Sequence, residues 1–152
     1  MLYKTNEQDY ELDTIIFDLN GTLAVWWMVD ERIPGLLGKL KEMWFRCILL
    51  TWDQRWVAAE LVQYGLEVVI AWNASQKKSW VQDHVDGNTS VAIGNARIDI
   101  GMFEITKIRI ATLQWEWIHT GILSHVDIIV PSVVDAILLF IDHDRFAATM
   151  KI

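Results

Sequence analysis

TIIFDLNGTL, residues 14–23, is the most informative stretch of this chain. Its first four residues are β-branched or aromatic, as a strand buried on both faces of a parallel sheet requires. The Asn20-Gly21 pair then ends the strand with residues that tolerate turn conformations. Asp18 is therefore expected at the carboxyl edge of a sheet, where open α/β sheets bind their ligands. For this segment alone, an aspartate that caps an ordinary loop is the alternative.

Short apolar runs alternate with helical patterns along the rest of the chain. The strands expected after 14–17 are 46–50, 67–70, 90–93, 108–112 and 126–130. The expected helices begin at Pro34 and then cover 54–64, 75–86, 99–105, 115–123 and 133–150. Such alternation is typical of parallel strands joined by right-handed crossovers. The sequence therefore predicts an α/β fold, a three-layer sandwich with a doubly wound, mainly parallel sheet, in one domain over residues 1–152.

The composition is that of a globular protein. Apolar residues make up 53% of the chain and charged residues 22%, and no apolar run has the length that crosses a bilayer. The net charge of −7 disfavours broad attraction to nucleic acid or anionic membranes, so we expect neither as a partner. The first 13 residues do not fit a secretory signal, which predicts a cytoplasmic protein. Cys47 is the only cysteine, and it is expected to be a buried strand thiol.

Polar residues follow several of the predicted strands. Thr51 ends the second strand, Lys78 opens the helix after the third, and the fourth runs into GNARID, residues 94–99. The fold should gather these positions with Asp18 in one crevice. Each residue type suits a phosphoryl group: Asp18 as nucleophile, Thr51 as hydrogen-bond donor, Lys78 as countercharge, and Asp99 with Asp18 as hard oxygen ligands for Mg²⁺.

In order and spacing, these motifs resemble those of the haloacid dehalogenase (HAD) superfamily of phosphohydrolases. The resemblance covers essentially the whole chain, from the Asp-x-Asp-Gly-Thr motif, here DLNGT at 18–22, to the acidic motif at 94–99. A narrower likeness, on FDLNGTLA at 17–24, the Leu-Thr pair at 50–51 and VAIGN at 91–95, is to small soluble proteins related to the catalytic domain of P-type ATPases.

The resemblance implies roles for individual residues. Asp18 would form an aspartyl-phosphate, and Thr51 and Lys78 would bind the transferred phosphoryl, with the adjacent Lys77 as the alternative lysine. Mg²⁺ would be held by Asp18, by the backbone carbonyl of Asn20 and by the acidic motif, through Asp99 and the Asn95 position. A phosphorylated substrate is therefore the expected partner.

The chain departs from the family pattern in ways that affect the chemistry. Asn20 stands where phosphatases of the superfamily usually carry a second aspartate, the general acid and base. An amide cannot shuttle a proton, and such assistance is worth roughly 10² to 10⁴ in rate, so slow turnover is expected. P-type ATPases also lack a carboxylate at this position. In the acidic motif Asn95 replaces one carboxylate, and Ile98 replaces a common asparagine.

The segments 22–46 and 51–78 have no room for a cap domain, so the site should be open unless a second subunit covers it. Capless relatives tend to act on large substrates or as oligomers, and a homo-oligomer is therefore one expected assembly. Residues 24–33 should form a short flap, whose Trp26, Trp27 and Met28 would contact a partner or substrate, or pack on the protein itself. The nine tryptophans in all indicate an interface or ligand surface as one interpretation.

Two alternatives remain at this level. A receiver domain of two-component signalling also uses an Asp, a Thr and a Lys around Mg²⁺, but there the phosphorylated Asp ends the third strand, and Ile70–Asn73 contain none. A non-catalytic binding or scaffold protein with a degenerate HAD-like site is the other alternative, to which Asn20, Asn95 and Ile98 point.

Overall fold

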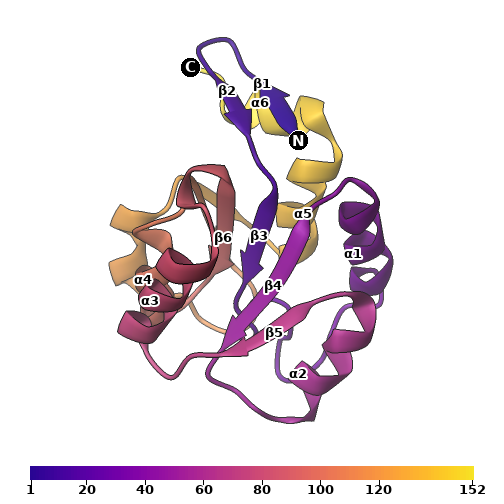
Figure 1. Ribbon diagram of the computed structural model, residues 1–152, viewed down its shortest axis with the longest axis vertical. Coiled ribbons are helices and arrows are strands. Elements are labelled where there is room, and N and C mark those ends of the chain that lie inside the picture. Colours follow the sequence, from indigo (N-terminus) through magenta and orange to yellow (C-terminus); the bar gives the residue numbers. More distant parts are fainter.

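The computed structural model describes all 152 residues, and its centre is a six-stranded parallel sheet with the order β5-β4-β3-β6-β7-β8 (Figure 1). The strands of this sheet are β3 (Thr14–Phe17), β4 (Arg46–Thr51), β5 (Glu67–Ile70), β6 (Ser90–Gly94), β7 (Ile108–Thr112) and β8 (Ile128–Val130). Five of them begin at the predicted residue, and β8 begins two residues later than expected. The predicted three-layer α/β architecture is confirmed.

Helices cover both faces of the sheet, with α1, α2 and α5 on one side and α3 and α4 on the other (Figure 1). Their bounds are α1 (Ile33–Glu42), α2 (Trp56–Leu61), α3 (Ala74–His84), α4 (Ile100–Phe103), α5 (Val133–Ile141) and α6 (His143–Thr149). Short 3₁₀ turns are η1 (Val62–Tyr64), η2 (Gly87–Thr89), η3 (Arg97–Asp99) and η4 (Thr120–His125). No helix is long and apolar enough to cross a membrane.

Alternate residues of the strands feed two separate cores. Ile15 and Phe17 of β3 belong to the larger core under α1 and α5, whereas Ile16 belongs to the smaller core under α3 and α4. This alternation is the consequence of the two-residue period of a strand. It explains why the strand segments read as continuous apolar runs.

Two predicted helices differ from the structure. In place of the predicted helix 115–123, residues 115–119 form a loop that is followed by η4. The loop backbone is held by Asn95. The side-chain amide of Asn95 donates to the Trp117 carbonyl, and the His119 N–H donates to the backbone carbonyl of Asn95. The predicted helix 133–150 is divided at Asp142 into α5 and α6. The Asp142 carboxylate caps α6 by accepting from the backbone N–H groups of Asp144 and Arg145.

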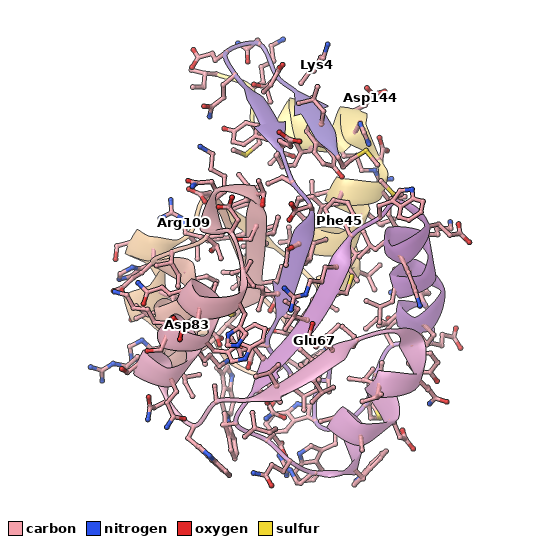
Figure 2. All side chains as sticks on the ribbon, viewed as in Figure 1. Lys4, Phe45, Glu67, Asp83, Arg109 and Asp144 are labelled. Carbon is pink, nitrogen blue, oxygen red and sulfur yellow. The ribbon has the colours of Figure 1, made fainter.

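An antiparallel hairpin, which the sequence analysis did not predict, precedes the sheet. It pairs β1 (Leu2–Lys4) with β2 (Asp9–Glu11) and packs beside α6. The Tyr3 hydroxyl donates to the Phe140 carbonyl at 2.6 Å, and the rings of Phe45 and Phe146 lie near that of Tyr3. Figure 2 labels Phe45 at the start of β4. The hairpin and both termini lie at the end of the molecule opposite to that toward which β3 and β4 point (Figure 1).

Candidate active site

Three neighbouring strands bring the predicted motifs to one edge of the sheet. Phe17 pairs with Leu49 of β4 and with Ile93 of β6, so the chain leaves all three strands at a similar level. Asp18 follows β3 directly, Thr51 is the last residue of β4, and Asn95 follows β6. All three residues are buried. The expected gathering of motifs at the carboxyl edge is therefore present.

A buried lysine joins the two aspartates of the site. The Nζ of Lys77 on α3 lies 2.8 Å from Asp18 Oδ1 and 2.7 Å from Asp99 Oδ1, and both are hydrogen-bonded ion pairs. The lysine and Asp99 have no exposed surface, and Asp18 retains 3%. Buried charged groups of this kind are tolerated when each one is paired and hydrogen-bonded. The three side chains together carry one negative charge when all are ionised.

Burial and neighbouring charge shift the pKa values of Asp18 and Lys77. Loss of solvent, and then the charge of Asp99, raise the pKa of Asp18 to about 7, although Lys77 opposes the shift. Burial alone would lower the pKa of Lys77, but attraction to the two carboxylates and the bonds to them raise it. The lysine is therefore a permanent cation, and Asp18 is a carboxylate held in an environment that disfavours its charge.

The preference for Lys78 over Lys77 is wrong. Lys78 lies on the exposed side of α3, where its Nζ pairs with Glu104 at 2.6 Å. The structure places Lys77 in the position that the sequence analysis assigned to Lys78. Lys77 and Val81 are the buried residues of α3, one turn apart on the same face. That i, i+4 relation to an apolar residue is the signal that distinguishes the two lysines.

Asp99 does not fit the expected role of a metal ligand. Its Oδ1 accepts from Lys77, and its Oδ2 accepts from the backbone N–H groups of Asn95 and Ala96 at 3.0 and 2.9 Å. A Cβ at Gly94 would lie 2.4 Å from Asp99 Oδ2, so only glycine allows this packing. Asp99 thus organises the turn after β6 and holds Lys77.

Three other oxygen groups fit a hard cation better. The buried Oδ1 of Asn95 has no hydrogen-bond partner, which is costly for a buried acceptor. The bridge beside Asn20 uses the Leu19 carbonyl and the Gly21 N–H, and no backbone N–H donates to the Asn20 carbonyl. With the Asp18 carboxylate, these groups supply the oxygen ligands that Mg²⁺ accepts alongside water. No group of three or more Asp, Glu, His or Cys side chains could hold a metal in this structure.

Asp53 is a site residue that the sequence analysis missed. Its Oδ2 accepts from Asn20 Nδ2 at 3.0 Å, and both of its oxygens accept from the Arg55 side chain. The bonds from Arg55 hold the pKa of Asp53 well below its usual range. Because a carboxylate only accepts, the Asn20 amide must turn its nitrogen toward Asp53 and its oxygen away. A carboxylate two residues beyond a strand that ends in Thr51 was the available signal.

Thr51 supports this arrangement from the end of β4. Its hydroxyl oxygen accepts from the Asp53 N–H at 3.0 Å, which leaves the hydroxyl proton available for another acceptor. The structure therefore places Thr51, Asp53 and Asn20 in one connected group beside Asp18.

The flap contacts Trp117 and Arg55, two residues that are bonded to the site. Val25 and Met28 exchange two backbone hydrogen bonds, so Trp26 and Trp27 are the two central residues of a tight hairpin turn. Trp26 contacts Trp117 edge to face, with ring centroids 6.2 Å apart, and the Arg55 guanidinium lies 4.7 Å from the centroid of a Trp27 ring. The expected flap is present. No helix or strand lies between β3 and α1, and only α2, η1 and β5 lie between β4 and α3, so neither segment contains a cap domain.

Comparisons with known proteins agree with the fold. No family model and no curated protein matches the chain. Among solved structures, a protein assigned to the HAD family of hydrolases from Streptomyces avermitilis matches with a TM-score of 0.68 at 18% identity, over 89% of this chain and 84% of its own. The 3-deoxy-D-manno-octulosonate 8-phosphate phosphatase of Moraxella catarrhalis, in complex with magnesium, phosphate and its sugar acid, matches with a TM-score of 0.69 at 14% identity, over 91% and 92% of the two chains.

The cobalt-bound deoxy-D-mannose-octulosonate 8-phosphate phosphatase from Haemophilus influenzae gives a TM-score of 0.69 at 11% identity, over 89% of this chain and 91% of its own. The chain therefore has the fold of the HAD hydrolases, as its motifs predicted. The narrower likeness to relatives of P-type ATPases stays a prediction.

Proposed function

We propose that this protein transfers phosphoryl groups from, or hydrolyses, phosphate esters through an aspartyl-phosphate on Asp18, with Mg²⁺ as cofactor. The observation that carries the proposal is the buried Lys77, whose Nζ bonds to both Asp18 and Asp99. Strongly perturbed carboxylates at the carboxyl edge of an α/β sheet are typical of catalytic sites. The solved phosphatase from Moraxella catarrhalis, which has this fold, holds magnesium and phosphate.

The Mg²⁺ ligands in this proposal are the carboxylate of Asp18, the carbonyl of Asn20 and the Oδ1 of Asn95. When bound, the ion would neutralise negative charge on the phosphoryl oxygens and on Asp18. The unpartnered oxygen of Asn95 supports this ligand set because a cation would satisfy it.

In the first step, a carboxylate oxygen of Asp18 attacks phosphorus, and the bond from phosphorus to the ester oxygen breaks. The leaving oxygen takes the electron pair of that bond and obtains its proton from water. In hydrolysis, a water molecule then attacks phosphorus, the bond to Asp18 breaks, and inorganic phosphate leaves with the water oxygen. Lys77 stays protonated throughout, and the free hydroxyl proton of Thr51 can donate to a phosphoryl oxygen.

We expect slow turnover because no side chain beside Asp18 is free to carry a proton. Asn20 is an amide, and Asp53 is saturated by Asn20 and Arg55, with its pKa lowered by the arginine. The missing general acid and base corresponds to a loss of roughly 10² to 10⁴ in rate. The phosphoenzyme should therefore persist longer than in a phosphatase with two aspartates.

A non-catalytic binding protein is the second candidate function. The absence of any cluster of three acidic, histidine or cysteine side chains able to hold a metal favours it. The two candidates differ in whether Asp18 reacts.

The test is hydrolysis of 4-nitrophenyl phosphate with and without Mg²⁺, and adduct formation with beryllium fluoride, in three proteins. The wild type should release phosphate and form an adduct on Asp18, and Asp18→Asn should do neither. Asp83→Asn, which removes an exposed carboxylate of α3, is the matched control and should behave as the wild type. Equal background rates in all three proteins, with no adduct, would support the binding protein instead.

A further inference from the structure

Exposed tryptophans surround the candidate site. None of the nine tryptophans of the chain is buried. Six of them lie on loops that follow the carboxyl ends of the strands, Trp115 among them, and we name the other five the tryptophan rim: Trp26, Trp27, Trp52, Trp72 and Trp117. Their side chains are 44–83% exposed, whereas tryptophan is highly buried on average in folded proteins.

Hydrogen bonds and ring contacts connect the rim to the site. The Trp117 carbonyl accepts from Asn95, and the Trp117 ring contacts that of Trp26. On the other side, the Arg55 guanidinium lies over Trp27 and is held by Asp53, the residue that orients Asn20. The rim is therefore part of the mouth of the site and not a separate surface.

Two rim residues occupy a costly backbone conformation. Trp26 has a φ of 50° and Trp27 a φ of 65°, values that glycine and asparagine normally fill in such a turn. Each costs about 1–2 kcal/mol for a residue with a Cβ. With 53% and 54% of their surface exposed, the two side chains are only about half covered, so both indoles stay open to a ligand. Backbone strain of this kind clusters at functional sites.

A groove of about 520 Å³ opens beside the site between two rim residues. It is lined by Trp52, Asp53, Gln54, Arg55 and Trp72. Asp53 is shared with the site, because the same carboxylate bonds to Asn20. A volume of this size suits a small molecule. The only charged groups of the lining, Asp53 and Arg55, already neutralise each other.

We propose that this groove binds the leaving group of the substrate, and that this group is a flat, uncharged aromatic ring. The inference rests on the proposed function, because it places the ester next to Asp18. Tryptophan faces favour stacking on a planar ring. A second anionic group on the substrate would meet a paired arginine and a protein of net charge −7, which disfavours it.

The test compares three phosphate esters whose alcohols are similarly poor leaving groups: benzyl, cyclohexylmethyl and ethyl phosphate. In the wild type, kcat/KM for benzyl phosphate should exceed that for the other two by about tenfold or more, as one stacking contact provides. In Trp52→Ala/Trp72→Ala this preference should fall to near unity. Trp44→Ala removes a tryptophan that is 90% exposed before β4, at the opposite edge of the sheet, and should keep the full preference.

A second measurement separates failure of the inference from failure of the proposed function. Calorimetric titration with benzylphosphonate and methylphosphonate measures the preference without turnover. If no ester is hydrolysed but benzylphosphonate binds about tenfold more tightly, and only while Trp52 and Trp72 are present, the groove is confirmed and the catalytic proposal fails.

Equal kcat/KM values of the wild type for benzyl and ethyl phosphate would overturn the inference. It would also be overturned if the double variant kept the preference, or if it changed only the sedimentation of the protein, since the rim would then be a contact between copies of the chain. Circular dichroism of each variant should match the wild type, because the replaced side chains are 44% and 58% exposed. The single variants Trp52→Leu and Trp72→Leu, which retain apolar bulk without a flat face, should each lower the preference partially.

Discussion

Lys77 is a charged residue with no exposed surface, which is costly unless the charge is paired. An ammonium without exposed surface is tolerated because it is paired and hydrogen-bonded, here to Asp18 and Asp99. The cluster therefore serves as a rigid support for Asp18 and not as a net source of stability.

The two adjacent lysines provide a matched pair for testing this role. Lys77→Met leaves two carboxylates buried without a cation, and we expect it to lower the free energy of unfolding by about 3–5 kcal/mol. Lys78→Met breaks a pair whose side chains are 41% and 39% exposed, and it should cost about 1 kcal/mol or less. Urea denaturation at neutral pH measures both. Equal losses in the two variants would contradict the assignment of Lys77 to the site.

Asn20 provides a second residue-scale prediction. Asn20→Asp places a carboxylate against Asp53, where like charges raise the pKa of one of them and leave a proton on the pair. We expect faster hydrolysis, with the largest gain at acid pH, because the added proton donor acts only while protonated. Rates of 4-nitrophenyl phosphate hydrolysis between pH 5 and 8 measure the gain. A gain that instead grows with pH would indicate that the new residue acts only as a base.

At this scale the sequence predicted the site residues better than their contacts. The strand ends fixed the neighbourhood of Asp18, Thr51 and Asn95, since parallel strands carry their carboxyl ends to one edge. Adjacent residues of a helix point about 100° apart, so the orientation of α3 about its axis decides whether Lys77 or Lys78 is buried. The spacing of the strand ends does not constrain that orientation. The Asp53 network depended on a loop conformation that no periodicity encodes.

At the level of the elements, the turn after α1 has an unfavourable residue. Trp44 has a φ of 67°, follows the C-cap residue Met43, and donates its N–H to the Lys41 carbonyl. Glycine is the usual residue at such a position because it has no Cβ to clash. The indole is 90% exposed, so its removal forfeits little burial.

We expect Trp44→Gly to raise the free energy of unfolding by about 1 kcal/mol, by relief of the left-handed strain. Trp44→Ala keeps the Cβ and should gain nothing, which separates the backbone effect from loss of the exposed ring. Thermal and urea unfolding of the two variants measure the difference. A gain shared by both variants would assign it to the indole instead.

Elements with apolar periodicity could be predicted, and those held by other contacts could not. The strands of the six-stranded sheet lie close to their predicted positions because burial on both faces of a sheet requires continuous apolar runs in the sequence. The loop at 115–119 was mistaken for a helix because its conformation depends on Asn95, 22 residues before Trp117. The N-terminal hairpin was missed because its strands have only three residues each, and its stability comes from packing beside α6.

For the molecule as a whole, the site reduces stability in the absence of a cation. The folded state raises the pKa of Asp18 from 3.8 to about 7, so folding favours its protonated form. The corresponding stability is complete below the unfolded value of 3.8 and is lost as the pH rises through about 7.

Asp18→Asn should therefore be more stable than the wild type at pH 8 in EDTA, by roughly a few kcal/mol, since one pKa unit corresponds to about 1.4 kcal/mol. The advantage should shrink toward zero as the pH approaches 4. Urea titrations at pH 8 and pH 4.5 measure the change, with Asp83→Asn as the control that should show no such advantage. A pH-independent difference would mean that the carboxylate is not destabilised by its surroundings.

The location of the tryptophans has a practical consequence for spectroscopy. Since every indole lies at or near the surface, loss of the folded state should move few of them from an apolar to an aqueous environment. The usual red shift of emission on denaturation will be small, and unfolding is better followed by far-ultraviolet circular dichroism. Conversely, Trp52 and Trp72 line one groove, so quenching of their emission by iodide or acrylamide becomes a sensor of whatever occupies it.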